Sequence, residues 1–187
     1  MPLSEPPASF DGFPELRAPR SIYRIHRREL DALYFSDSGL GRFDLRAPEG
    51  TLYAAGSEIG AFVEVFRSTL IPTAEVEARA LARVSTGGTR LADCTSPAAR
   101  GFGVTAAIHS IPDYALTQRW AAAFRLAGFG GVAYLVSHDP SASAEGFAIF
   151  GSRRDSALSV EADGPIDEEL VAVARETFGL LVVPAPG

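Results

Sequence analysis

The stretch GTLYAAGSEIGAFVEVF, residues 50–66, contains the transition from a strand to a helix that decides how the first half of the chain folds. GTLYAA is typical of a strand, and Gly56 with Ser57 supplies a turn and an N-cap for the helix that follows. Apolar residues then recur at the i, i+3, i+4, i+7 spacing of an amphipathic helix: Ile59, Phe62, Val63, Phe66 and Leu70. We therefore predict a strand followed by a helix from about Ser57 to Leu70.

One acid in this helix, Glu64, lies off the apolar stripe when residues are placed at about 100° intervals. Its neighbours one turn earlier are Gly60 and Ala61. Small residues beside an acid leave room for a ligand to approach. A face that is merely solvated does not need small residues there. Glu64 is therefore a candidate site residue, and the alternative is a surface glutamate paired with Arg67 one turn further on.

Three more candidates lie before this segment or within it. SIYRIH (21–26) predicts a short first strand with Arg24 on its wetter side, and the glycine-rich stretch 37–50 predicts an extended loop that holds Arg42 in GRFD. Tyr53 lies on the strand GTLYAA. Each has an ordinary alternative, because most arginines of a soluble domain are solvated and a strand tyrosine commonly packs in the core.

Together these groups suit one kind of ligand. Two arginines can hold a diphosphate, an aromatic ring can stack on a base, and a carboxylate can stabilise positive charge on a ribose. NAD is therefore the first ligand to test.

The rest of the chain predicts an α+β domain over residues 20–187, preceded by a loose, flexible arm over residues 1–19 that is rich in Pro, Ser and Glu. We expect, in order, a strand-rich stretch (76–94), a loop (101–113), a helix starting at Asp113 and stopping at Gly128, two buried strands (130–137 and 145–151), a helix (166–178), and LLVVP (180–184) as a candidate strand that closes the sheet.

Composition excludes several classes of function. The net charge of −6 argues against binding nucleic acid, which requires clustered cations. A single cysteine excludes an internal disulfide, and three separated histidines give no metal-ligand spacing, so we expect no metal. No secretion signal or membrane span is recognised, and we expect a soluble, cytoplasmic protein with no membrane partner.

With these residues in view, the sequence resembles the RES domain family, the toxins of bacterial toxin–antitoxin pairs, from about Ser21 to Phe150. The matching parts follow in order as YR, GRFD, LYAAGS, the helix with the acid, and the strand pair GVAYLVS and GFAIFG. Ser137 in GVAYLVS is the counterpart of the family's serine. That serine usually lies two places after the strand's tyrosine, whereas Val136 takes this place here, so strand alternation turns Ser137 to the other face unless the backbone bulges.

The resemblance implies a fold similar to ADP-ribosyltransferases, with a split β-sheet and flanking helices around an NAD cleft. It implies Glu64 and Arg24 as catalytic residues, and Arg24, Arg42, Tyr53 and Ser137 as residues that bind NAD. NAD+ is then a substrate and no prosthetic group is needed. A cognate antitoxin is the implied protein partner, and a homo-oligomer is left open.

Three activities are compatible with this resemblance. The first is a toxin that consumes NAD+ by cleaving the nicotinamide–ribose bond with water or phosphate. The second is transfer of ADP-ribose to a protein target. The third is a catalytically silent domain that keeps the fold and binds a partner, which the displaced serine favours.

Overall fold

The computed structural model describes residues 2–152 and 157–184. Its elements are, in chain order, β1 (Glu15–Arg17), β2 (Ser21–Arg27), β3 (Gly50–Ala55), α1 (Glu58–Val65), β4 (Leu70–Pro72), α2 (Thr73–Glu77), β5 (Arg79–Ser85), β6 (Arg90–Asp93), the 3-10 helix η1 (Pro97–Phe102), α3 (Ala107–Ser110), α4 (Tyr114–Leu126), β7 (Gly131–Leu135), β8 (Glu145–Gly151), β9 (Ser159–Pro165), α5 (Glu168–Phe178) and β10 (Leu181–Val183).

Eight of the strands in the described ranges form one mixed sheet in the order β1-β6-β7-β8-β3-β2-β5-β9. Within it β6 and β7 run parallel, and the other neighbours are antiparallel. β2 and β3 pair through Tyr23 and Ala55, at the end of β3. The sheet is therefore divided into two halves, as the α+β class with a split sheet predicts.

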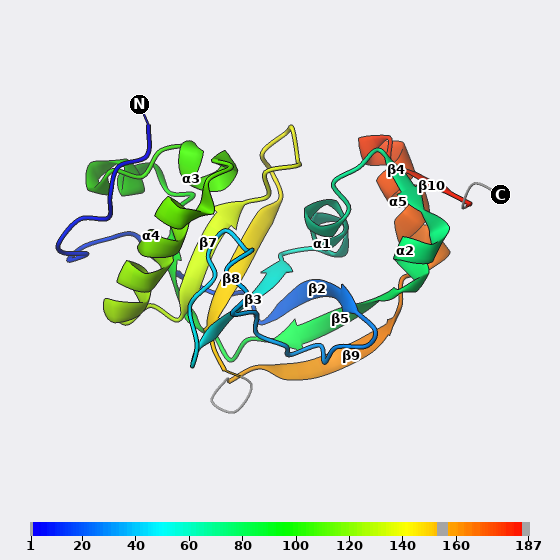
Figure 1. Cartoon of the computed structure of the whole chain (residues 1–187), viewed down its shortest axis with the longest axis horizontal. Helices are drawn as coiled ribbons and strands as arrows, with labels where there is room; N and C mark the ends of the chain where they lie inside the picture. The colour runs from blue at the N-terminus through cyan, green and yellow to red at the C-terminus, as the bar shows by residue number, and fades with distance from the viewer. Residues whose placement is uncertain (1, 153–156, 185–187) are drawn as a thin grey trace.

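Helices cover one face of this sheet, which we call the helical face. Figure 1 shows α3 and α4 at one end of the molecule and α2 and α5 at the other, with α1 between them. Trp120 and Phe124 of α4 pack in one buried cluster, while Phe62 of α1 packs with Leu170 of α5 in another. The framework on both sides of α1 is therefore fixed by core packing.

The opposite face, which we call the loop face, is covered by connecting segments. Ile22 and Leu52 from the strands form a buried cluster there with Ala32 and Leu158, which lie outside the strands. Beyond this cover, β9 forms one edge of the sheet, and most of its residues are exposed. The described part of the chain contains no helix with the length and apolar character required to cross a bilayer.

One expected helix boundary and one expected strand pairing are wrong. The helix predicted to reach Leu70 ends at Val65, because Phe66 adopts an extended backbone and buries its ring. Leu70 instead begins β4. The strand expected at 180–184 forms as β10, but it pairs in parallel with β4 as a separate sheet and does not close the main one.

The segment before β2 is packed, contrary to the loose arm that its composition predicts. Leu3 and Phe13 are buried in the same cluster as Trp120, and β1 pairs with β6. The indole of Trp120 also donates a hydrogen bond to the carbonyl of Ser4 (2.8 Å). A few apolar side chains in a polar, proline-rich segment are thus enough to hold it on the core.

Candidate active site

The GRFD loop is organised around the buried carboxylate of Asp44. This carboxylate accepts hydrogen bonds from the amide of Gly41 (3.0 Å), the hydroxyl of Tyr53 (2.9 Å) and the hydroxyl of Ser38 (3.2 Å). A Cβ at Gly41 would collide with the Asp44 carboxylate and the Tyr53 hydroxyl, so the loop requires glycine there. The motif GRFD therefore contains its own anchor.

Arg42 is fixed between this loop and the start of α4. Its carbonyl accepts a hydrogen bond from the hydroxyl of Thr117 (2.6 Å), and its Nη1 donates to the carbonyl of Ile111 (2.8 Å). Its guanidinium carbon lies 4.8 Å from the centre of the Tyr114 ring, within the range of a cation–π contact. The side chain is half-buried, so its direction is set while part of it stays accessible.

Glu64 lies on α1, facing β7. The hydroxyl of Tyr134 donates to Oε1 of Glu64 (3.1 Å), whereas Oε2 is buried and has no hydrogen-bond partner. Burial raises the pKa of Glu64, and the Tyr134 hydrogen bond and the charges of Arg67 and Arg42 act in the opposite direction. The carboxylate is thus held at one oxygen and unsatisfied at the other.

Two histidines that the sequence did not identify as candidates lie close to the groups around Glu64. Nδ1 of His109 accepts a hydrogen bond from the amide of Leu135 (3.3 Å), and burial, with the charge of Arg42, lowers the pKa of His109 to about 4. Burial and the charges of Arg67 and Arg42 also lower the pKa of His138. Arg42 therefore acts electrostatically on both imidazoles and on Glu64, and we refer to these four groups as the polar cluster.

Tyr53 belongs to the same region but has a different task from the one expected. Its hydroxyl accepts a hydrogen bond from the amide of Phe43 (2.8 Å) while donating to Asp44. Burial is the main cause that raises its pKa well above the usual value. Tyr53 thus anchors the loop that carries Arg42, and stacking of its ring on a nicotinamide stays a prediction.

Arg24 is not brought to this cluster. Along β2, Tyr23 and Ile25 pack on the helical face near α1, while Ile22 belongs to the cluster on the loop face. Side chains alternate along a strand, so Arg24 faces the loop side with Ile22. Burial lowers its pKa to about 10, and the charge of Asp31 opposes this shift. The structure therefore separates Arg24 from Arg42 and Glu64, contrary to the expectation.

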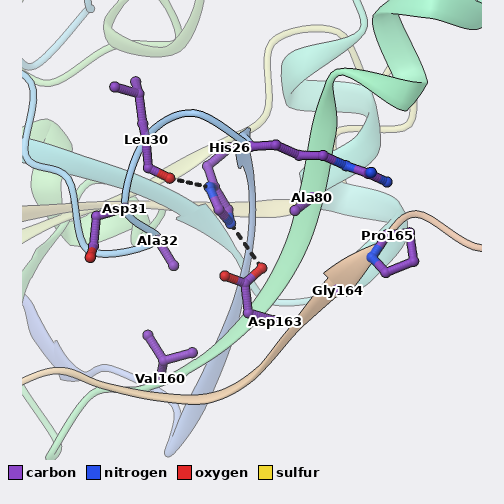
Figure 2. Close-up of a pocket in the computed structure, with 10 residues that line it drawn as sticks. His26, Leu30, Asp31, Ala32, Ala80, Val160, Asp163, Gly164 and Pro165 are labelled. Carbon is purple, nitrogen blue, oxygen red and sulfur yellow. Dashed lines mark hydrogen bonds and ion pairs between the residues drawn. The ribbon is translucent and has the colours of Figure 1, made fainter.

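A cavity of about 400 Å³ lies beside β2 and β9, and His26 of β2 lines it (Figure 2). There Nδ1 of the buried His26 donates to the carbonyl of Leu30 (3.2 Å), and Nε2 lies 3.0 Å from Oδ1 of Asp163. These contacts tie the turn after β2 to β9. His26 is thus part of the framework on the loop face.

Ser137 lies beyond the end of β7 and is exposed. Because the strand stops at Leu135, the alternation that would have turned the serine away does not apply to it. Ser137 lines a different cavity, on the other side of α1, together with Val63 and Arg67. Ser137 therefore lies near the part of α1 that carries Glu64.

Asp44 and Tyr134 are the functional candidates that sequence reasoning missed, although both lie in quoted motifs, GRFD and GVAYLVS. The role of Tyr134 depends on its contact with Glu64 of α1, which no local pattern contains. Asp44 accepts hydrogen bonds from Gly41 and Ser38 within the same loop, so the turn chemistry of this stretch is a signal that could have found it. Within residues 2–152 and 157–184, no group of three or more His, Cys, Asp or Glu side chains is arranged to hold a metal ion.

Comparisons with known proteins agree on one family and fold. The family model described as the RES domain matches residues 17–172. Among solved structures, a chain of the crystal structure of the M. tuberculosis MbcT-MbcA toxin-antitoxin complex is similar, with a TM-score of 0.71 and 18% sequence identity, over 90% of this chain and 95% of that chain. No curated protein matches the chain.

Proposed function

The chain belongs to the RES domain family, and from this premise we propose that it is an enzyme that cleaves the bond between nicotinamide and ribose in NAD+. The observation that carries the proposal is the buried, unpartnered Oε2 of Glu64. A buried carboxylate oxygen without a donor costs free energy, so such an oxygen points to a ligand that supplies the donor.

The chemistry of glycosidic cleavage explains what this carboxylate does. As the bond to nicotinamide breaks, positive charge grows on the ribose in an oxocarbenium-like state. We propose that Oε2 accepts a hydrogen bond from a ribose hydroxyl and that the negative charge of Glu64 stabilises the developing cation. Tyr134 holds the other oxygen in place, so the carboxylate does not have to reorganise during the reaction.

Arg42 is the proposed cation for the diphosphate, since a guanidinium donates paired hydrogen bonds to phosphate oxygens. Its contacts with Ile111 and Tyr114 direct it before a ligand arrives. Arg24, on the loop face, has no step in this proposal. The substrate is NAD+, and the acceptor is water or phosphate.

We also propose that the enzyme is a toxin restrained by a cognate antitoxin. The similar solved structure is a toxin–antitoxin complex, and the family resemblance implies the same arrangement. An enzyme that drains NAD+ in the cell that makes it has to be restrained, which is the physical reason for such a partner.

Release of nicotinamide from NAD+ by the purified protein, with and without inorganic phosphate, tests the activity. We expect release that Glu64→Gln lowers about 100-fold or more, the order seen when one charge-stabilising group is removed from an active site. Glu58→Gln, an exposed acid in the first turn of the same helix, is the matched control and should keep full activity.

The acceptor is read from the same assay. Dependence on phosphate identifies phosphorolysis, and a labelled protein band formed only in lysate identifies transfer of ADP-ribose. If no nicotinamide is released in any of these conditions, or if Glu64→Gln is as active as the unchanged protein, the proposed activity is wrong.

A further inference from the structure

A cavity of about 590 Å³ lies between the end of α1, the loop after β7 and the end of α5. Its floor is apolar, because Val63, Phe66 and Leu180 are buried there. Its rim carries hydroxyls, the guanidinium of Arg67 and the imidazole of His138, and the hydroxyls come from Thr69, Thr177, Ser137, Ser141 and Ser143. An apolar floor with a few polar groups, at this volume, is typical of a small-molecule site.

The loop that forms the rim is held in shape by one carboxylate. Asp139 is buried, and it accepts hydrogen bonds from the amides of Ser141 (2.9 Å), Ser143 (2.8 Å) and Ala144 (2.8 Å). These bonds outweigh burial and hold the pKa of Asp139 well below its usual range. A rim built this way is organised before a ligand binds, which lowers the cost of binding.

The cavity adjoins the cluster around Glu64. Val63 lines it directly before Glu64 in α1, and Arg67 lines it one turn later. The Nε of Arg67 donates to the main-chain carbonyl of Glu64 (3.3 Å), so this guanidinium is not simply the surface ion-pair partner that spacing suggests. The charges of Arg67 and Arg42 both act on Glu64 and on His138. Arg67 therefore lines the cavity within one turn of Glu64, and Arg42 acts electrostatically on Glu64 and on His138 at the rim.

From this arrangement we infer that the cavity binds the adenosine half of NAD+, with the diphosphate between Arg42 and Arg67 and the nicotinamide riboside at Glu64. The inference rests on the proposed function. The flat apolar base suits the floor of Phe66 and its neighbours, the rim hydroxyls suit the ribose and the polar edge of the base, and the cations suit the diphosphate. Arg67 is thus the second arginine proposed to bind the diphosphate, the role expected of Arg24 from the sequence.

Thr177→Trp tests the inference, because Thr177 is exposed in the last turn of α5 and lines the cavity, so that an indole fills the space without disturbing the core. We expect this variant to raise the KM for NAD+ at least tenfold with a smaller change in kcat. Calorimetry with ADP, which contains the adenosine half and the diphosphate but no nicotinamide, should show binding to the unchanged protein and at least tenfold weaker binding to Thr177→Trp.

Ala172→Trp is the matched control, since Ala172 is exposed on the same helix and does not line the cavity. It should leave ADP binding and the KM unchanged. No ADP binding by the unchanged protein, or equal binding by both tryptophan variants and the unchanged protein, would overturn the inference. Absence of nicotinamide release, with ADP binding lost only in Thr177→Trp, would instead overturn the proposed activity and leave the nucleotide site standing.

Discussion

Among single residues, Glu64 carries the proposed chemistry and affects the stability of the candidate site. One of its carboxylate oxygens has a donor and the other is buried without one. An unsatisfied buried group of this kind costs about 1–3 kcal/mol in proteins generally. Under the proposed function, the unpartnered oxygen lowers the stability of the protein without substrate, a cost that active sites commonly carry.

Glu64→Gln should raise the melting temperature at neutral pH. Burial raises the folded-state pKa of Glu64 above its ordinary value of 4.5. When Glu64 is protonated, the folded protein avoids the cost of burying a charge. This contribution to stability is fully present below the pKa of Glu64 in the unfolded chain, and it is lost as the pH rises through the pKa in the folded protein. Glutamine has no charge, so it keeps the contribution at every pH. Melting curves of both proteins should differ at pH 7 and converge towards pH 4. A variant that melts lower than the unchanged protein at pH 7 would contradict this.

Tyr134→Phe should move the acid side of the activity profile to higher pH. The Tyr134 hydroxyl donates to Glu64 and is the largest influence that lowers the pKa of this carboxylate against burial. Without the donor, Glu64 takes up its proton at higher pH, and the proposed reaction needs the ionised form. Profiles of kcat/KM against pH for both proteins measure the shift, and an unchanged acid limb would show that Tyr134 does not act through Glu64.

At the scale of elements, the loop between β2 and β3 depends on one tyrosine in the strand that follows it. Tyr53→Phe removes the donor to the buried Asp44 and the acceptor for the amide of Phe43. We expect a loss of about 1–3 kcal/mol in the free energy of unfolding, measured by denaturant titration, because two buried groups lose a partner.

The same variant separates the two roles of Tyr53. Anchoring through the hydroxyl predicts that Tyr53→Phe also raises the KM for NAD+, because the loop that carries Arg42 is no longer fixed. Stacking through the ring predicts normal activity, because phenylalanine keeps an aromatic face. Steady-state kinetics with NAD+ distinguish these outcomes.

Elements with a clear apolar pattern could be predicted from the sequence. EGFAIFG forms β8 over the expected residues, and Asp113 caps α4 where the pattern placed the start of a helix. β9 was not expected, because SVEADGP is polar and exposed and becomes a strand only by pairing with β5. β1 has three residues and likewise forms only through β6.

The candidate site was predicted in part, for a similar reason. Local pattern identified Arg42 and Glu64 as candidates, and the charge of Arg42 is one of the influences that lower the pKa of Glu64. Alternation along β2 separates Arg24 from its neighbour Tyr23, but only tertiary packing decides which face α1 covers. Tyr134 gains its role from a hydrogen bond to Glu64, which lies in a distant segment that no sequence window contains together with it. The contacts of Asp44 with Gly41 and of Arg67 with Glu64 are local, but the sequence pattern does not show what those side chains face.

At the scale of the whole molecule, the N-terminal segment is part of the core. Deleting residues 1–13 removes Leu3, Phe10 and Phe13 from the cluster that contains Trp120. Each such side chain contributes about 1.5–3 kcal/mol when buried, and a whole domain is stable by only about 5–15 kcal/mol. We expect the shortened protein to melt at much lower temperature or to be insoluble, as calorimetry and solubility measurements will show.

Glu5→Ala is the control for this truncation, because it breaks an exposed ion pair with Arg119 and leaves the apolar contacts in place. It should melt close to the unchanged protein. A truncated protein that melts as the full chain does would show that the segment adds nothing to the core.

The exposed strand β9 limits how copies of this protein meet. An unpaired strand edge invites another chain to continue the sheet, and aggregation begins in this way. β9 ends at Pro165, which has no amide hydrogen to offer, and its register with β5 is interrupted by a bulge. Two acids of β9 form contacts within the chain: Glu161 pairs with Arg83, and Asp163 contacts His26. The terminal proline, the bulge and the charged side chains thus make β9 a poor template for another strand.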